Sequence, residues 1–429
     1  MFKKSSLLIG ILAAGLISIG CAGETETIIV EKEVLVEVPV EKVVEKPIIV
    51  EKEVIKEVPV ERIVEVEKVQ IKEVIKEVVV EKEVAAKEAA SFLDGDKVYN
   101  FTMSGQLSPT LKQWTNLEAP WLLGDDSKIV KNSNGKVKVK LNTASELGVG
   151  QFDVLRFLSS GVIDIGMSVF TSISGDVPLA GGIDLAGAYP ELDGVKAKAG
   201  TNAFIPELNK QMESSLGIKI IGHYNNPAQV PYCKFPITGS DDLKDKRVRT
   251  FGSTLGDYVE HFGGINVTIA FVDVYSAMQT GIADCAITGT GSGNAQKWYE
   301  ITEYLYTLPV GHAITGWGAN LDMWNKQPTD VQDFLQDTFT SMTADGWDLG
   351  MALTQDGIDC NTGVAAGCEL GTLDSDSPMT QVVPSAADYD ALKAAASETV
   401  LPRWVERCGI DCKVIYNRTI AEVTGVSIP

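Results

Sequence analysis

From Lys97 onward, short strand-like runs of hydrophobic residues alternate with segments in which hydrophobic residues recur at helical spacing. The strand-like runs lie at residues 98–105, 136–143, 162–169, 216–224, 246–252, 266–271 and 282–289, and the helix-like segments lie at residues 111–132, 151–161 and 274–281. Strands separated by helical segments of this length predict an α/β fold built on largely parallel sheets.

The longest helical pattern lies in the C-terminal half, over Gln327–Gln355. Its hydrophobic positions at helical spacing are Val331, Phe334, Leu335, Phe339 and Met342. Pro328 suits the first turn of this helix, because the backbone N–H that proline lacks has no partner there. We therefore expect one long helix in this part of the chain.

Residues 24–90 have a different pattern from the rest of the chain. They consist mainly of Val, Ile, Glu and Lys, with almost no aromatic residues. The segment Ile28–Pro47 recurs as Ile48–Glu67, and a third, degraded copy follows. The repeat suggests a solenoid at first, but no glycine-marked turn closes each copy.

Prolines interrupt this repeat region at Pro39, Pro47 and Pro59 and exclude one continuous helix. We interpret residues 21–92 as a mobile or semi-extended stalk that carries no chemistry. The alternative is a short coiled coil within residues 69–90, which would make the protein an oligomer. The helical stripe of that coiled coil would consist of Val74, Ile75 and Val78.

The N-terminus has the layout of an export signal. Lys3 and Lys4 precede an apolar run over Leu7–Ile19, and Ser-Ile-Gly leads directly to Cys21. This order resembles a bacterial lipobox, which implies a signal peptide over residues 1–20 and lipidation of Cys21. The alternatives are an ordinary cleaved signal and an uncleaved anchor. The apolar run is too short to cross a bilayer, which excludes a polytopic membrane protein.

Composition narrows the function classes. The chain has 429 residues, 45% of them hydrophobic, so it is long enough for two domains and too apolar to be wholly disordered. It carries 37 basic and 58 acidic residues, a formal net charge of −21, and no basic cluster. Because nucleic-acid binding depends on clustered cations, we expect no nucleic-acid partner.

Six cysteines remain when Cys21 is set aside, and export permits disulfides between them. Sequence alone allows many connectivities. Local spacing favours the pairs Cys360–Cys368 and Cys408–Cys412, which leaves Cys233–Cys285. The alternative is a zinc site, but there is no Cys-x-x-Cys, and the three histidines, His223, His261 and His312, lie far apart.

A search for catalytic motifs gives little. The chain has no Gly-x-Ser-x-Gly elbow, Walker loop or His-Glu-x-x-His. The glycine-rich segment Gly289–Asn294 follows a predicted strand, and we interpret it as a tight strand-to-helix turn. Its backbone N–H groups are candidates for facing an anion. We expect no enzyme activity, no catalytic residue, no cofactor and no metal.

Two segments carry a family motif. Asp242–Arg249 reads DLKDKRVR, and Asp273–Asp284 reads DVYSAMQTGIAD. This pair resembles the solute-binding proteins of TRAP (tripartite ATP-independent periplasmic) transporters, and weaker agreement extends over residues 97–429. The resemblance implies a two-domain periplasmic-binding-protein fold of type II with hinge strands. Domain I would comprise residues 96–227 plus 311–345, and domain II residues 228–310 plus 346–429.

The resemblance also implies a ligand site between the domains. Arg249 would end a strand at the cleft and bind a ligand carboxylate bidentately, as the planar guanidinium allows. Gln229 would supply a second polar contact, and Phe271 would pack on the ligand. The alternatives are a surface ion pair for Arg249, a satisfied strand-end amide for Gln229 and a core position for Phe271.

The chain departs from the family pattern beside this motif. Ile287 stands where the family commonly has Glu, and Thr288 follows it as a ligand-binding candidate. Ser104 and Ser168, also candidates, stand where relatives with polyhydroxylated ligands carry larger polar groups. An apolar wall would leave ligand hydroxyls unpaired, so we expect a carboxylate with an apolar or aromatic body rather than a sugar acid.

The implied function is capture of an organic anion outside the cytoplasm and delivery to a TRAP-type membrane permease, whose transport is driven by an ion gradient. The protein would be lipid-anchored, in the periplasm or on the outer face of the cytoplasmic membrane. Expected partners are a small organic acid, the permease subunits and the membrane, with a stalk-mediated oligomer as a further option. The alternative function is a stalked surface lipoprotein with a sensing or adhesive role.

Overall fold

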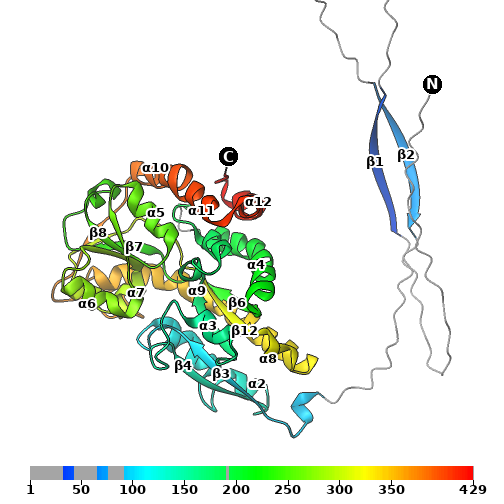
Figure 1. Ribbon diagram of the computed structural model, residues 1–429, viewed down its shortest axis with the longest axis horizontal. Helices are drawn as coiled ribbons and strands as arrows, with labels where there is room; N and C mark the ends of the chain where they lie inside the picture. The colour runs from blue at the N-terminus through cyan, green and yellow to red at the C-terminus, as the bar shows by residue number, and fades with distance from the viewer. Residues whose placement is uncertain (1–31, 43–64, 76–90, 190–192, 429) are drawn as a thin grey trace, which may run out of the picture. The chain divides into compact units, whose positions relative to one another are not determined.

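The computed structural model describes residues 32–42, 65–75, 91–189 and 193–428, which fall into two units divided after residue 89. In the first unit, β1 (Lys32–Lys42) pairs antiparallel with β2 (Glu65–Ile75) (Figure 1). Val74 and Ile75 belong to β2, so the helical stripe proposed for them is wrong; β-branched residues favour a strand there. Val78, the predicted signal peptide and Cys21 lie outside the described residues.

The second unit contains a five-stranded sheet with the order β4-β3-β5-β12-β6. Its strands are β3 (Tyr99–Gly105), β4 (Val137–Thr143), β5 (Ile165–Val169), β6 (Ile218–Tyr224) and β12 (Thr315–Asn320). β3 is parallel to β4 and β5, whereas β12 is antiparallel to β5 and β6. All five strands fall within the ranges predicted for domain I.

A six-stranded sheet has the order β13-β11-β7-β10-β8-β9. Its strands are β7 (Gln229–Cys233), β8 (Arg247–Thr250), β9 (Ile265–Thr268), β10 (Cys285–Gly289), β11 (Tyr304–Tyr306) and β13 (Thr380–Val382). β8 is parallel to β9 and β10, and β11 is parallel to β13, but β7 is antiparallel to β10 and β11. These strands fall within the ranges predicted for domain II, whose exact boundaries stay a prediction.

The prediction of largely parallel sheets is wrong for β7 and β12. Both strands receive the chain from the other sheet, so each begins where its neighbours end. Gln229, the first residue of β7, lies opposite Gly289, the last residue of β10. Thr315, the first residue of β12, lies opposite the final residues of β5 and β6. The carboxyl ends of the parallel strands of both sheets therefore face the same region, which is where open α/β sheets bind ligands.

Helices cover the sheets (Figure 1). They are α1 (Ala119–Leu122), α2 (Lys128–Asn132), α3 (Val154–Ser159), α4 (Gly194–Leu216), α5 (Ser253–His261), α6 (Val274–Gln279), α7 (Thr290–Ala295), α8 (Leu321–Asn325), α9 (Thr329–Asn361), α10 (Ala386–Ala395), α11 (Leu401–Cys408), α12 (Ile410–Asn417) and α13 (Ile420–Thr424). Short 3₁₀ segments lie at Phe92–Asp94, Phe170–Ile173, Pro178–Asp184, Ser240–Leu243, Phe271–Asp273 and Trp298–Glu300, and π-helical turns at Trp114–Glu118 and Ala396–Val400. Within the described residues, none of the helices combines the length and apolar character needed to cross a membrane.

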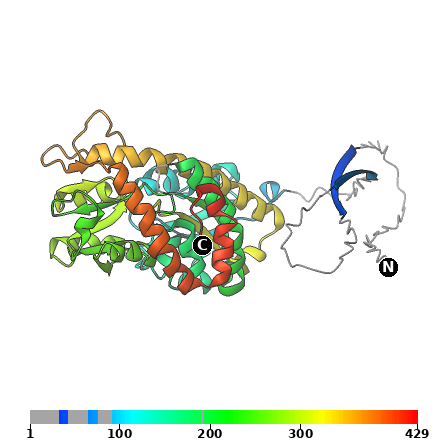
Figure 2. The ribbon, with the colours of Figure 1, turned by 90° about the horizontal axis from the view of Figure 1, so that it is seen from above.

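The predicted long helix is confirmed as α9, which links the two sheets. In its first half, the side chain of Gln336 donates to the backbone carbonyl of Ile221 in β6, at 2.9 Å. In its second half, the carbonyl of Thr354 accepts from the hydroxyl of Thr290 in α7, at 2.8 Å. One rigid helix therefore supports both halves of the second unit, as the view in Figure 2 also shows.

The C-terminal helices also contact both halves. Arg403 of α11 pairs with Glu260 of α5 at 2.6 Å, beside the six-stranded sheet. Arg418, just after α12, pairs with Glu207 of α4 at 2.6 Å, beside the five-stranded sheet. The segment 346–429 thus packs across both predicted domains rather than on domain II alone, because its amphipathic helices bury apolar faces against α4 and α5.

The three disulfides favoured by the cysteine spacing are confirmed. They are Cys233–Cys285, Cys360–Cys368 and Cys408–Cys412. Cys233 and Cys285 lie directly opposite each other in β7 and β10, so this bond fixes the two central strands of the six-stranded sheet.

Candidate functional site

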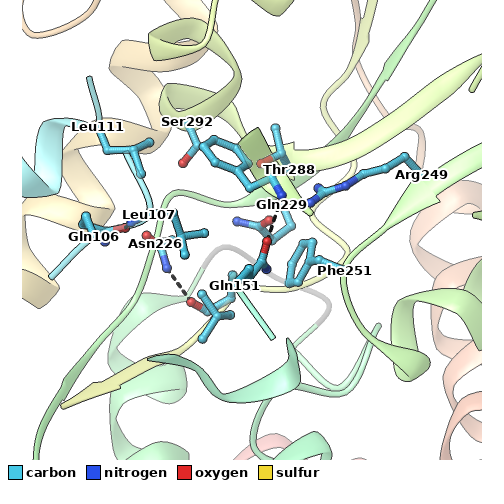
Figure 3. Close-up of a pocket in the computed structure, with 13 residues that line it drawn as sticks. Gln106, Leu107, Leu111, Gln151, Asn226, Gln229, Arg249, Phe251, Thr288 and Ser292 are labelled. Carbon is cyan, nitrogen blue, oxygen red and sulfur yellow. Dashed lines mark hydrogen bonds between the residues drawn. The ribbon is translucent and has the colours of Figure 1, made fainter. Parts of the chain in front are cut away.

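A cavity that is partly open to solvent lies where the carboxyl ends of the strands meet (Figure 3). Its lining residues come from both sheets and their loops: Gln106, Leu107, Leu111, Gln151, Val169, Asn226, Gln229, Arg249, Phe251, Phe271, Thr288, Ser292 and Ala313. Arg249 is the one residue among them that carries a charge at neutral pH. The cavity is therefore a small, mostly neutral chamber around one cation.

Arg249 lies near the end of β8, as predicted, and is fully buried. Its Nε donates to the carbonyl of Ile269 and its Nη1 to the carbonyl of Ile287, each at 2.9 Å. Its Nη2 is buried and has no hydrogen-bond partner in the described part of the chain. Burial lowers the pKa of the guanidinium to about 9, so it stays charged at neutral pH.

The position of this cation excludes the alternative of a surface ion pair, because no carboxylate of the described residues pairs with it. Its guanidinium carbon lies 5.3 Å from the centre of the Phe251 ring and 5.8 Å from that of the Trp298 ring. Aromatic faces stabilise the cation but do not neutralise it. A buried charge with a free N–H is costly unless an anion joins it.

Four side-chain amides line the cavity, with orientations fixed by their surroundings. The Nε2 of Gln106 donates to the hydroxyl of Tyr224, at 2.9 Å. The Nε2 of Gln229 donates to the carbonyl of Pro227, at 2.7 Å. The Oε1 of Gln151 accepts from the backbone N–H of Phe271, at 2.8 Å. Asn226 donates to the carbonyl of Ala313 and to the hydroxyl of Thr315, each at 2.7 Å.

Two hydroxyls and two aromatic rings complete the cavity beside the arginine. The hydroxyls of Thr288 and Ser292 form no hydrogen bond with the described residues, although both lie in the lining. Phe251 and Phe271 supply flat apolar surface. Figure 3 shows the Arg249 side chain extending from its strand toward Gln229 and Thr288.

Two predicted site residues do not line the cavity. Ser104 of β3 and Ser168 of β5 are buried, and the hydroxyl of each has no partner among the described residues. Both lie within strands of the five-stranded sheet, short of the carboxyl ends that surround the cavity. The structure thus brings Arg249, Gln229 and Thr288 together with Phe271, and leaves the two serines apart.

The expected apolar wall at Ile287 is also misplaced. Ile287 is fully buried and is absent from the lining, because alternate residues of a strand face opposite sides and Thr288 takes the cavity side. Its backbone carbonyl instead receives Arg249. The apolar lining comes from other residues: Leu107, Leu111, Val169, Phe251 and Phe271.

A buried carboxyl group outside the lining holds one lining residue in place. Glu118 accepts from the backbone N–H of Gln106 and from the hydroxyl of Tyr224, each at 2.8 Å. Desolvation raises the pKa of Glu118 to about 8, although both hydrogen bonds lower it. A side chain at Gly105 would collide with this carboxyl group, so glycine is needed there.

A second buried carboxyl group holds the segment that enters β12. Asp184 accepts from the backbone N–H groups of His312, at 3.0 Å, and Ala313, at 2.6 Å. Ala313 has a left-handed φ of 47°, which costs energy for a residue with a Cβ. Burial raises the pKa of Asp184 to about 6. These bonds hold Ala313 at the cavity in a conformation it would not otherwise favour.

Sequence reasoning missed the residues that come from loops. Gln106 and Gln151 lie outside the central motif, and only the tertiary fold brings them to Arg249. Phe251 and Ser292 lie two and four residues beyond sites that the sequence did single out, Arg249 and Thr288. Within the described residues, no group of three or more His, Cys, Asp or Glu side chains is arranged to hold a metal ion.

Two mixed sheets with a buried cation in the cavity where their strand ends meet form the arrangement of a ligand-binding protein. Comparison with known proteins gives the family. The model of the bacterial extracellular solute-binding protein, family 7, matches residues 127–369, and the chain belongs to this family. It is therefore an extracytoplasmic receptor of the TRAP type.

Relatives agree with this assignment. A solute-binding protein of Sulfitobacter sp. (strain NAS-14.1) is 26% identical over 270 residues, which cover 62% of this chain and 80% of the relative. A Bordetella pertussis extracytoplasmic solute receptor binding pyroglutamic acid has a similar fold, with a TM-score of 0.65 and 18% identity over 76% of this chain and 100% of that one. A TRAP periplasmic solute-binding protein from Desulfovibrio salexigens with bound orotic acid also has a similar fold, with a TM-score of 0.66 and 20% identity over 76% of this chain and 99% of that one.

Proposed function

We propose that this protein captures an organic carboxylate outside the cytoplasm and delivers it to a TRAP-type membrane permease. The observation that carries the proposal is Arg249, a buried guanidinium whose Nη2 faces no partner among the described residues. A ligand carboxylate would accept from Nη2 and neutralise the charge, and such charge-assisted bonds are about twice as strong as neutral ones.

Gln229, Thr288 and Phe271 are proposed as further ligand contacts. They line the same cavity as Arg249, and the two polar ones have unused hydrogen-bonding capacity. The apolar lining supports a ligand with an apolar or aromatic body over a sugar acid, because buried hydroxyls without partners weaken binding. Pyroglutamic acid and orotic acid, which two similar folds bind, each combine a ring with one carboxyl group.

Capture is proposed to involve closure of one half of the unit over the other. Bonds on either side of the cavity support this step. Gln296 donates to the hydroxyl of Thr110 at 2.6 Å, and the hydroxyls of Ser174 and Ser253 lie 3.2 Å apart. Each pair joins a segment beside the five-stranded sheet to a segment beside the six-stranded sheet. A ligand that contacts both halves would stabilise this closed arrangement over an open one.

The N-terminal region is proposed to tether the receptor. Lipidation of Cys21 would hold the chain at the membrane, and residues 21–92 would act as a spacer that lets the binding unit reach both solute and permease. The alternative function, a stalked lipoprotein with a sensing or adhesive role, rests on this same region.

A thermal-shift screen of the ligand-stripped protein against organic acids and their neutral analogues tests the proposal. A ligand at a hundredfold excess over its Kd adds about 2.7 kcal/mol of stability. We expect a clear rise in Tm with some carboxylates, none with the neutral analogues, and no rise in Arg249→Ala. The matched control Arg247→Ala removes an exposed arginine two residues away, which pairs with Asp284, and should keep the ligand response. A protein that responds to no organic acid would favour the adhesive role.

A further inference from the structure

We infer that the ligand carries exactly one negative charge and no positive charge, and that its uncharged part presents both a hydrogen-bond donor and an acceptor, as a lactam or imide does. This inference rests on the proposed function and specifies the ligand class of the same cavity. It follows from counting the charges and the unused hydrogen-bonding atoms of the lining.

The charged residues of the lining can neutralise one ligand carboxylate. Arg249 is the sole charged residue of the lining, and two of its nitrogens are already committed to the carbonyls of Ile269 and Ile287. The remaining Nη2 can serve one carboxylate. A second carboxylate would meet no cation, and the side chains bonded to the lining from behind, Glu118 and Asp184, are themselves acids.

The charges of the lining also exclude a ligand with an ammonium group. No carboxylate lines the cavity. Asp184 and Glu118 lie behind Ala313 and Gln106, where backbone N–H groups and the Tyr224 hydroxyl already occupy their oxygens. An amino acid with a free ammonium group would bury a second charge without a counter-charge. Uncompensated buried charges are strongly unfavourable.

The amides define the uncharged part of the ligand. Because Gln229 uses its Nε2 on the carbonyl of Pro227, its Oε1 is the atom left to accept. Because Gln151 uses its Oε1 on the N–H of Phe271, its Nε2 is the atom left to donate. Neither leftover atom bonds to the described residues. A ligand edge with one N–H and one C=O satisfies both.

The apolar lining sets the shape of that uncharged part. Phe251 and Phe271 present aromatic surface, and Leu107 and Leu111 add aliphatic surface. A compact ring suits these walls better than a flexible chain, because a ring loses less conformational freedom on binding. The hydroxyls of Thr288 and Ser292 can act as donor or acceptor and add no charge requirement.

Calorimetric titration of the full-length protein in detergent, stripped of ligand with its disulfides intact, tests the inference with five matched compounds. Pyroglutamate has one carboxylate and a lactam. Cyclopentanecarboxylate lacks the lactam, proline has a ring ammonium group in place of the lactam, glutarate is an open chain with a second carboxylate in place of the lactam, and 2-pyrrolidinone lacks the carboxylate. We expect pyroglutamate to bind most tightly and cyclopentanecarboxylate about tenfold more weakly. Proline and glutarate should be weaker by about 100-fold or more, and 2-pyrrolidinone should not bind.

The outcomes separate the two claims. Glutarate or proline binding within tenfold of pyroglutamate would overturn the inference and leave carboxylate capture standing. Binding of none of the carboxylates would overturn the proposed function and the inference together. Gln229→Leu provides an internal check, since it removes the acceptor, together with the bond from Nε2 to the carbonyl of Pro227, and leaves the charges of the lining unchanged. The variant should lose most of the preference for pyroglutamate over cyclopentanecarboxylate; an unchanged ratio of the two affinities would contradict the amide assignment.

Discussion

The side-chain oxygen of Gln151 accepts a 2.8 Å hydrogen bond from the backbone N–H of Phe271, and both residues line the cavity. Gln151 follows β4 of the five-stranded sheet, and Phe271 follows β9 of the six-stranded sheet. The bond therefore joins the two halves at the cavity itself and fixes the orientation of the Gln151 amide there.

Gln151→Ala should weaken ligand binding without unfolding the protein. The variant loses the bond to Phe271 and one direct ligand contact, each worth about 0.5–1.5 kcal/mol, so we expect Kd to rise by roughly 5–100-fold. Calorimetric titration measures the change. Gln355→Ala, on the exposed side of α9, is the matched control and should bind normally. Equal affinity of Gln151→Ala and the wild type would remove Gln151 from the site.

Substitutions of Arg249 should separate the contribution of its charge to ligand affinity from that of its hydrogen-bonding geometry. Arg249→Lys keeps a cation but cannot hold the carbonyls of Ile269 and Ile287 while it also reaches the ligand. We expect affinity to fall about 10–100-fold in Arg249→Lys and by at least about 1,000-fold in Arg249→Ala. Circular dichroism checks that both variants fold. Tight binding by Arg249→Ala would show that the carboxylate is held elsewhere.

The sequence predicted the part of this site that a continuous motif carries. Arg249, Thr288 and Phe271 were named because they lie in or beside the family motif that the chain resembles, and all three line the cavity. Gln106 and Gln151 carry no such signal, because their place at the cavity depends on contacts with residues 118 and 271 rather than on local pattern. Ser104 and Ser168 lie one residue before the ends of β3 and β5 and are absent from the lining; in β5 the next residue, Val169, faces the cavity, because successive side chains of a strand point to opposite sides.

Much of the fold could also be predicted from the sequence. The predicted strands and α9 follow hydrophobic patterning, and the disulfides follow cysteine spacing. The reversed direction of β7 and β12 could not be predicted from the sequence. It depends on the chain entering each strand from the other sheet, which no local pattern shows. The predicted helix over residues 111–132 is three pieces, the π-helical turn Trp114–Glu118, α1 and α2, because Pro120 and Gly124 interrupt regular hydrogen bonding.

Glu118 should make stability depend on pH. Its pKa is raised from 4.5 to about 8 in the folded protein, so the folded state holds this proton more tightly than the unfolded chain does. The free energy of unfolding contributed by this group therefore falls as pH rises from about 4.5 to about 8. Glu118→Gln removes the titration.

Urea unfolding of the wild type and Glu118→Gln at pH 5 and pH 8.5 measures this effect. From pH 5 to pH 8.5, we expect the free energy of unfolding of Glu118→Gln to rise by roughly 2–4 kcal/mol relative to that of the wild type. Glu303→Gln, an exposed glutamate, is the control and should show no such gain. A constant difference between Glu118→Gln and the wild type would mean that Glu118 is ionised in the folded state at both pH values.

The three disulfides should differ in their contribution to stability. Cys233–Cys285 spans 52 residues, Cys360–Cys368 spans 8 and Cys408–Cys412 spans 4. Because a longer closed loop restricts the unfolded chain more, replacing the pairs by alanine should cost about 4, 2.5 and 2 kcal/mol in that order. Denaturant unfolding of the three double variants gives the ranking. A larger cost for Cys408–Cys412 than for Cys233–Cys285 would contradict this ranking.

The most direct test of carboxylate capture is a crystal structure of the protein with the acid that gives the largest thermal shift. We expect a carboxylate oxygen about 2.8 Å from Nη2 of Arg249, within the cavity lined by Gln229 and Thr288. A ligand bound in this cavity with its carboxylate away from Arg249, or bound at another place on the protein, would contradict it.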